Sequence, residues 1–181
     1  MRNVKILAVC GALVAVAIPM VLFVHASAQS TPMTEDQMNR IRTNCVSTKN
    51  TLTQLHASDA LLRVNRGQIY LSMTTKLMNR FNTRANNNSA DVKDLTGVTS
   101  SYESTLLNFQ NDYKAYEEQL SSVLKIDCSK EPVAFYDAVT RARTKRAQVH
   151  NDVLALHQYI DTYKTTFDTF VTQLNVGGGT N

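Results

Sequence analysis

A heptad-like apolar pattern between residues 132 and 174 constrains the fold of this chain more than any other feature. Side chains recur there at alternating steps of four and three, and eleven of the twelve positions are apolar or aromatic. These positions are Phe135, Val139, Ala142, Arg146, Val149, Val153, Leu156, Ile160, Tyr163, Phe167, Phe170 and Leu174. The pattern indicates an α-helix that packs one face against other helices. Such a helix is about 65 Å long, so its partners should be equally long.

Two further stretches carry the same kind of pattern and are separated by short turn sequences, Asn86–Ser89 and Asp127–Pro132. Short turns between long helices favour antiparallel neighbours. The predicted fold class is therefore all-α, an elongated antiparallel three-helix coiled-coil-like bundle over residues 34–175. We expect its helices at about 34–86, 90–126 and 130–174, after a linker at 29–33 and before a flexible tail at 176–181.

The first of these helices should begin after Thr34, which forms a capping box with Gln37. Its inward-facing series is Met38, Ile41, Cys45, Thr48, Leu52, Leu55, Asp59, Leu62 and Arg66. After Gly67 the pattern continues better through Tyr70, Met73, Leu77 and Phe81. This change predicts a small shift in phase, a mild kink or a close helix contact near the glycine.

Residues 1–28 have the features of an export signal. Arg2 and Lys5 precede an apolar run over residues 6–24, and Ala26-Ser27-Ala28 offers a cleavage site before Gln29. The run is also close to the length that spans a bilayer, so an uncleaved anchor is the alternative to a cleaved signal peptide. We favour cleavage. In both cases the rest of the chain is expected outside the cytoplasm: secreted, periplasmic or on the cell surface.

The exported part contains two cysteines, Cys45 and Cys128, which suggest one disulfide. If the first two helices fold back about residue 87, the two cysteines lie at the same level of the hairpin. We therefore predict a Cys45–Cys128 disulfide. The alternative is two buried free thiols. Closing so long a loop is expected to stabilise the fold by about 4–5 kcal/mol.

The same register brings a set of polar residues to one level. Asp59, Arg63 and Arg66 on the first helix fall near Arg146 and His150 on the third. One interpretation is a site for an anionic ligand. The interpretation that we favour is a polar core layer, in which buried ion pairs fix the helix register. In that layer Asp59 should pair with Arg63 or Arg146.

Other chemistry is weakly indicated. His150 and His157 share a helix face, but no third ligand completes a metal site, so none is predicted. No catalytic constellation, phosphate loop or cofactor motif is present, and we expect neither a cofactor nor an enzymatic activity. The formal charge of +4 includes no dense basic patch, which argues against nucleic acid as a partner.

The segment from Asp59 to Gly67, followed by Asp127-Cys128 and Phe135-Tyr136, resembles uncharacterised exported helical proteins of candidate-phylum (Saccharibacteria-like) bacteria. The resemblance spans most of residues 40–174. It implies an extracytoplasmic helical protein with two paired cysteines, and it transfers no functional site.

Two functions fit these observations. The first, which we favour, is a non-enzymatic extracytoplasmic bundle with an envelope, surface or partner-binding role, whose partner is an unknown envelope or other protein. The second is a ligand-sensing or ligand-binding bundle that uses the polar layer. Membrane contact is expected only through residues 6–24, if they are not removed.

Overall fold

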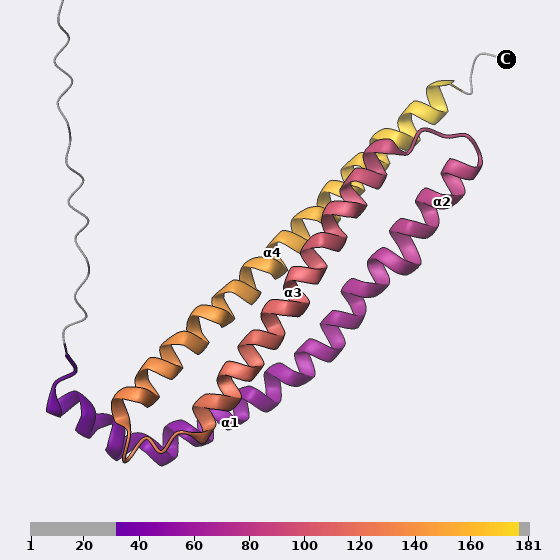
Figure 1. Ribbon diagram of the computed structural model, residues 1–181. Helices are drawn as coiled ribbons and strands as arrows, with labels where there is room; N and C mark the ends of the chain where they lie inside the picture. Colours follow the sequence, from indigo (N-terminus) through magenta and orange to yellow (C-terminus); the bar gives the residue numbers. More distant parts are fainter. Residues whose placement is uncertain (1–31, 178–181) are drawn as a thin grey trace, which may run out of the picture. The chain divides into compact units, whose positions relative to one another are not determined.

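The computed structural model describes residues 32–177, and the chain divides into Met1–Pro32 and Met33–Asn181. The signal or anchor segment predicted at residues 1–28 lies outside the described residues. The second unit contains α1 (Glu35–Ser72), the π-helical segment η1 (Met73–Met78), α2 (Asn79–Asn87), α3 (Lys93–Lys125) and α4 (Pro132–Gly177). Since α1, η1 and α2 follow each other without a break, they form one continuous helix (Figure 1).

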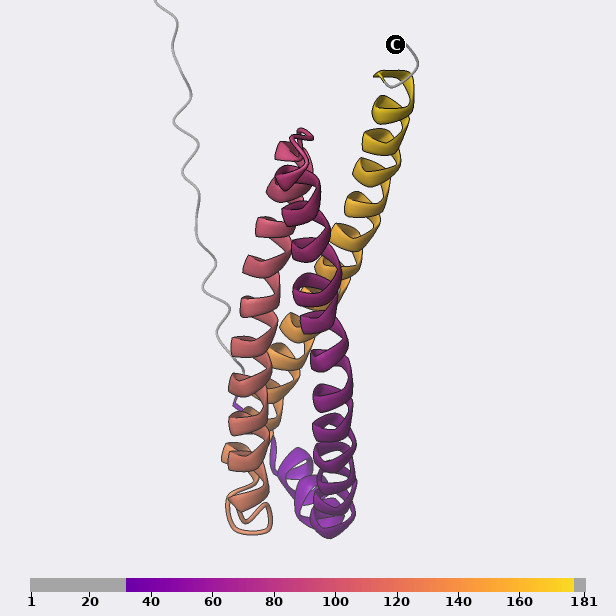
Figure 2. The ribbon, with the colours of Figure 1, turned by 90° about the vertical axis from the view of Figure 1, so that its right-hand side faces the viewer.

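This arrangement confirms the predicted all-α bundle, since residues 32–177 contain helices and turns without a strand. Figure 1 shows α3 running back along the α1–α2 helix, and α4 running back along α3. α1 and α4 therefore point in the same direction. α3 packs most extensively against α4. In the view of Figure 2 the last turns of α4, in yellow, extend past the α2–α3 turn.

The helix ends follow from local hydrogen bonding. The Thr34 hydroxyl accepts a hydrogen bond from the Gln37 amide at 3.4 Å, and the Thr34 amide donates to Gln37 Oε1 at 2.8 Å. This is the predicted capping box, which satisfies amides that have no partner within the helix. At the other end of the continuous helix, Ser89 adopts a positive φ of 60° and turns the chain toward α3. The Asp127 carboxylate accepts the amide of Ser129 at 3.0 Å and so stabilises the second turn.

The core follows the predicted period most closely in α3. The 3–4 series that starts at Val92, just before α3, is buried at every position: Val92, Leu95, Thr99, Tyr102, Leu106, Phe109, Tyr113, Tyr116, Leu120 and Val123. α4 contributes Phe135, Ala142, Leu156, Tyr163 and Phe170 from its own series. α3 is thus the central helix, because it packs against both the α1–α2 helix and α4.

α1 follows its predicted series only as far as Asp59. Between Asp59 and Tyr70 no side chain is buried. Leu62 is 47% exposed and Arg66 is also exposed, so their assignment to the helix seam is wrong. Leu61, Val64, Ile69 and Leu71 are exposed as well. Along this stretch α1 packs little against α4, which leaves space between the two helices.

The phase shift expected near Gly67 occurs instead in η1. A Cβ added at Gly67 would meet nothing within 4 Å, so this glycine makes no close helix contact. A π-helical turn holds one more residue than an α-helical turn, and buried positions recur there at steps of four: Tyr70, Thr74, Met78 and Asn82. Leu77, predicted to face inward, is 52% exposed, whereas Met78 is fully buried.

Side chains of α3 and α4 contact the backbone and side chains around η1. The Tyr102 hydroxyl donates to the carbonyl of Tyr70 at 2.9 Å. The Thr74 hydroxyl donates to Glu103 at 2.6 Å. One turn further on, the Tyr163 hydroxyl donates to Asn82 Oδ1 at 2.8 Å, and the Asn82 amide donates to Thr99 at 2.9 Å. Buried polar groups here have partners, as the low polarity of a core requires.

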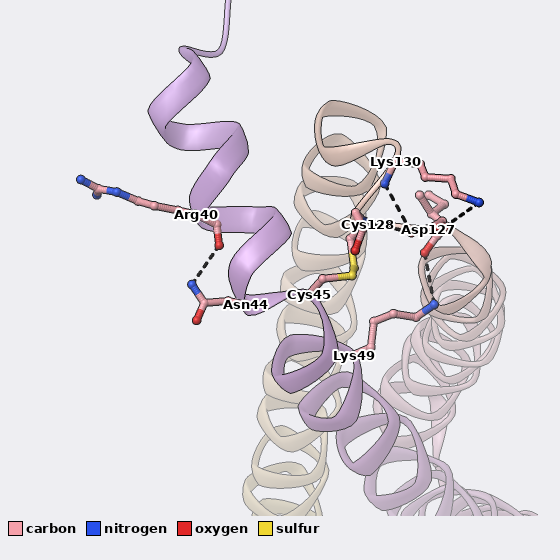
Figure 3. The surroundings of a disulfide bond; sticks show 9 residues. Arg40, Asn44, Cys45, Lys49, Asp127, Cys128 and Lys130 are labelled. Atoms are coloured by element: carbon pink, nitrogen blue, oxygen red, sulfur yellow. Dashed lines mark hydrogen bonds and ion pairs between the residues drawn. A yellow bond between two sulfur atoms is a disulfide. The ribbon is translucent and has the colours of Figure 1, made fainter.

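The predicted disulfide between Cys45 and Cys128 is present. The two Cα atoms are 5.5 Å apart, and the bond joins α1 to the α3–α4 turn (Figure 3). Both residues are buried in a small second core with Val123 and Phe135. Next to the disulfide, the Lys49 ammonium donates to the carbonyl of Ile126 at 3.2 Å. Disulfides persist in oxidising compartments, and this bond is compatible with such a location.

Candidate ligand-binding groove

A groove of about 600 Å³ lies between α1 and α4, with α3 as its floor. It opens where α1 loses its packing against α4. Its lining is Asp59, Leu62, Arg63 and Arg66 from α1, Phe109, Tyr113 and Tyr116 from α3, and Arg143, Arg146, Ala147, Val149, His150 and Val153 from α4. Three aromatic side chains and several aliphatic ones thus form an apolar surface beside four arginines.

Asp59 is held at one end of the groove by two neighbours. The Tyr116 hydroxyl donates to its Oδ2 at 2.7 Å, and Arg146 Nε donates to the same oxygen at 3.1 Å. The residue is 8% exposed, whereas the Arg146 side chain is 55% exposed. The hydrogen bond to Asp59 raises the pKa of Arg146. Burial, and then the hydrogen bond to Asp59, raise the pKa of Tyr116 well above its usual value. The hydroxyl therefore stays protonated and donates.

Arg63 also has an acidic partner, but a different one. Its guanidinium lies 2.7 Å from Glu117 and 5.3 Å from the centre of the Tyr113 ring. The position over the ring face allows a cation–π contact. Burial, and then the charges of Asp59 and Glu117, raise the pKa of Tyr113 to about 12. Of the two arginines predicted to meet Asp59, Arg146 does so and Arg63 does not.

The remaining arginines of the groove, Arg66 and Arg143, have no acidic partner among residues 32–177. They lie on opposite walls. The helix register also places them near opposite ends of the groove. Asp59 contacts Arg146 and Tyr70 contacts His157, and in both pairs the residue numbers differ by 87, so α1 and α4 keep one register along the groove. Arg66 is then level with Val153, ten residues along α4 from Arg143. Ten residues of helix span about 15 Å.

The predicted polar core layer is therefore corrected. The structure does bring Asp59, Arg63, Arg66, Arg146 and His150 together, since all five line the groove. They do not form a buried layer, because only Asp59 among them is buried. Burying several guanidinium groups would cost more desolvation free energy than their attraction to a single carboxylate could offset. An open groove avoids that cost.

Sequence reasoning missed Arg143 and the role of the aliphatic lining. Val149 and Val153 fit the apolar series of α4, which predicts that they pack on the core, and both do pack against it. In the structure both are partly buried and line the groove. A second arginine three residues before Arg146 was a signal for the groove, because residues at this spacing share a helix face.

The three histidines of the described helices lie in different environments and do not contact a common site. His150 lines the groove. His157 Nε2 is hydrogen-bonded to the Tyr70 hydroxyl at 3.0 Å, and His56 Nε2 lies 3.4 Å from Ser121 Oγ. In the part of the chain that the structure describes, no three His, Cys, Asp or Glu side chains are grouped so that they could hold a metal ion.

Asp112 of α3 and Asp152 of α4 form a second acidic feature, which does not line the groove. Burial, and then the charge of Asp112, raise the pKa of Asp152 to about 6. Its Oδ2 is buried and lacks a hydrogen-bond partner. An ionised Asp152 is therefore poorly stabilised in the folded protein.

Comparisons with models of protein families, with curated proteins and with solved structures found no match. The resemblance to exported proteins of candidate-phylum bacteria accordingly stays an expectation. Among the described helices, none is both long and apolar enough to cross a membrane.

Proposed function

We propose that this protein is a non-enzymatic, exported helical bundle that binds a negatively charged ligand in the groove between α1 and α4. The observation that carries the proposal is the pair of arginines, Arg66 and Arg143, that face an apolar groove without an acidic partner among the described residues. Anionic ligands form strong charge-assisted hydrogen bonds with arginine. A ligand with a negative group would complete the charge balance of the groove.

This proposal promotes the second of the two functions considered from the sequence. Ion pairs in a closed layer would serve to fix the helix register. Here the ion pairs Asp59–Arg146 and Arg63–Glu117 form, but the groove between α1 and α4 stays open. An envelope or surface setting, with an unknown partner that presents or receives the ligand, remains part of the proposal.

Binding rather than catalysis is favoured by the chemistry of the groove. Its basic side chains are mainly arginines, whose guanidinium groups offer several hydrogen-bond donors and no acceptor. Its carboxylate, Asp59, already accepts hydrogen bonds from Tyr116 and Arg146. These groups are suited to hold an anion and poorly suited to transfer protons.

An exported location is supported by two features. The Cys45–Cys128 disulfide fits an oxidising compartment. The positive residues, apolar run and Ala26-Ser27-Ala28 sequence fit an export signal. Amino-terminal sequencing of protein recovered from its native host tests this part. A mature chain beginning at Gln29 is expected, and an intact chain in the cytoplasm would contradict export.

The groove is tested with 1-anilinonaphthalene-8-sulfonate, an anionic aromatic probe whose fluorescence rises in apolar sites. We expect saturable binding to the wild-type protein. Arg66→Ala combined with Arg143→Ala should weaken it about 10- to 100-fold, as expected for the loss of charged hydrogen bonds. Arg40→Ala combined with Arg141→Ala removes the same charge outside the groove and is the matched control. Equal affinity of the two double variants would contradict the proposal.

A further inference from the structure

We infer that the ligand is an amphiphile, with one anionic head group held by Arg66 and an apolar body that lies on Phe109. This inference rests on the proposed function and specifies its ligand class. The two ends of the groove differ in chemistry, and this difference places both the head group and the apolar body at the end near Arg66.

The end of the groove near Asp59 is polar and contains its own carboxylate. Asp59, Tyr116 and Arg146 are hydrogen-bonded to each other there. Arg143 lies one turn from Arg146 on the same helix and belongs to this end. An anion bound there would face the carboxylate of Asp59, which opposes its binding.

The end of the groove near Arg66 is apolar. Phe109 forms the floor, since contacts such as Tyr116–Asp59 place α3 antiparallel to α1 and bring Phe109 near the level of Arg66. Leu62 is one turn away on α1, and Val149 and Val153 face it from α4. The acidic groove residue, Asp59, is seven residues from Arg66, about 10 Å along the helix. An anion at Arg66 therefore meets a cation, and no carboxylate of the groove lining lies beside it.

The size and exposure of the groove fit a small amphiphile. Its volume of about 600 Å³ lies within the range of about 300–1,000 Å³ typical of small-molecule sites. Leu62 is 47% exposed at the rim, and an apolar chain beside it would remove this surface from water. A small inorganic anion would leave the aromatic and aliphatic lining exposed. A neutral apolar molecule would leave Arg66 without a counter-charge.

The test uses isothermal titration calorimetry on the disulfide-bonded protein with probes that separate head group from chain. Octanoate and octyl phosphate carry the chain with a carboxylate or a phosphate, the two anionic heads that fit Arg66. Octyl glucoside carries the chain without charge, and acetate and inorganic phosphate carry the charge without the chain. We expect octanoate or octyl phosphate to bind at least about tenfold more tightly than octyl glucoside. The same compound should also bind at least about tenfold more tightly than the short anion with its head group, which is acetate for octanoate and inorganic phosphate for octyl phosphate. The tighter octyl anion identifies the head group.

Variants then locate the two parts of the ligand. Arg66→Ala should weaken binding of the octyl anion at least about tenfold, whereas Arg143→Ala should change it less than about threefold. Leu62→Asn places a polar group of similar size in the groove and should weaken it severalfold. Leu61→Asn is the matched control, because Leu61 is 69% exposed on the same helix and does not line the groove.

Several outcomes would overturn the inference, and the response to 1-anilinonaphthalene-8-sulfonate then decides whether the proposed function stands. One is binding of inorganic phosphate or acetate as tight as that of the octyl anion. Another is a larger loss with Arg143→Ala than with Arg66→Ala. Absence of octyl-anion binding would also overturn it. If the response to 1-anilinonaphthalene-8-sulfonate in these cases still requires the two arginines, anion binding persists and only the ligand class is wrong. If that response is unaffected by the arginines, the proposed function fails as well.

Discussion

Arg146 reaches across from α4 and donates to both carboxylate oxygens of Asp59 on α1, with Nε–Oδ2 and Nη2–Oδ1 distances of 3.1 Å and 3.5 Å. The two partners differ in environment, because Asp59 is buried and more than half of the Arg146 side chain is exposed. The contact fixes the level of α1 against α4 at the polar end of the groove. It also explains how α1 and α4 remain connected where the groove opens beside them.

Asp59→Ala should lower the free energy of unfolding by about 1–3 kcal/mol, because the buried Tyr116 hydroxyl loses its acceptor. Arg146 can turn toward water, so no buried cation is left behind. Urea denaturation measures the change, with the exposed Asp137→Ala as control. A loss of about 3–5 kcal/mol would match the breaking of a fully buried ion pair and would contradict an open groove.

The disulfide gives a second prediction. Replacing Cys45 and Cys128 together with alanine should lower the free energy of unfolding by about 4–5 kcal/mol, since the unfolded chain regains the freedom of a long closed loop. Reduced wild-type protein should behave similarly. Non-reducing mass spectrometry of the protein recovered from its native host checks that the bond forms. A stability change below about 1 kcal/mol would mean that the bond adds little to the fold.

The fold was predictable where side-chain period and burial agree. All ten positions of the 3–4 series from Val92 to Val123 are buried. α3 has neighbours on two sides, so its buried face cannot shift without exposing aromatic rings. The level of Cys45 and Cys128 was predictable for a related reason. A short turn fixes which residues of antiparallel helices face each other.

The open groove was not predictable from that period. Leu62 and Arg66 satisfy the 3–4 spacing, but spacing does not show whether a partner helix is near enough to cover them. The five exposed apolar side chains between Leu61 and Leu71 share the stretch with Arg63 and Arg66. Either face of α1 could have been turned inward, and tertiary contacts such as Arg63–Glu117 and Asp59–Arg146 decide between them.

A pH dependence should arise from Asp152, whose pKa in the folded protein is raised to about 6 from the usual 3.8. The unfolded chain releases this proton at lower pH, so folding takes up a proton between about pH 4 and pH 6. The free energy of unfolding therefore falls as the pH rises through this window. Above about pH 6 the contribution of Asp152 no longer changes with pH. Allowing for solvent near the group, the effect should be on the order of 1 kcal/mol.

Asp152→Asn should remove this component, so that the variant gains stability over wild type as the pH rises from about 4 to 6. Thermal unfolding at a series of pH values measures the difference. Asp112→Asn should have a similar, smaller effect, because it removes the charge that faces Asp152. The exposed Asp137→Asn is the control. A constant difference between Asp152→Asn and wild type across the window would contradict the raised pKa.

The π-helical segment η1 gives the last prediction. Its extra residue makes the buried positions recur at steps of four, through Tyr70, Thr74 and Met78. Deleting Thr75, which is exposed within η1, would leave Tyr70 and Thr74 in place and move Met78 to a spacing of three from Thr74. That spacing is what an ordinary α-helix needs to keep both sides of the deletion facing the core.

Deletion of Thr75 should therefore convert η1 to α-helix and change the melting temperature by only a few degrees. Deleting Thr53, which is exposed in the α-helical part of α1, should be far more harmful. It rotates the helix on one side of the deletion by about a quarter turn relative to the other, because an α-helix has 3.6 residues per turn. Cys45 and Asp59 then cannot both face their partners. If both deletions lowered the melting temperature equally, η1 would not be the place where the helix holds an extra residue, and the prediction would be wrong.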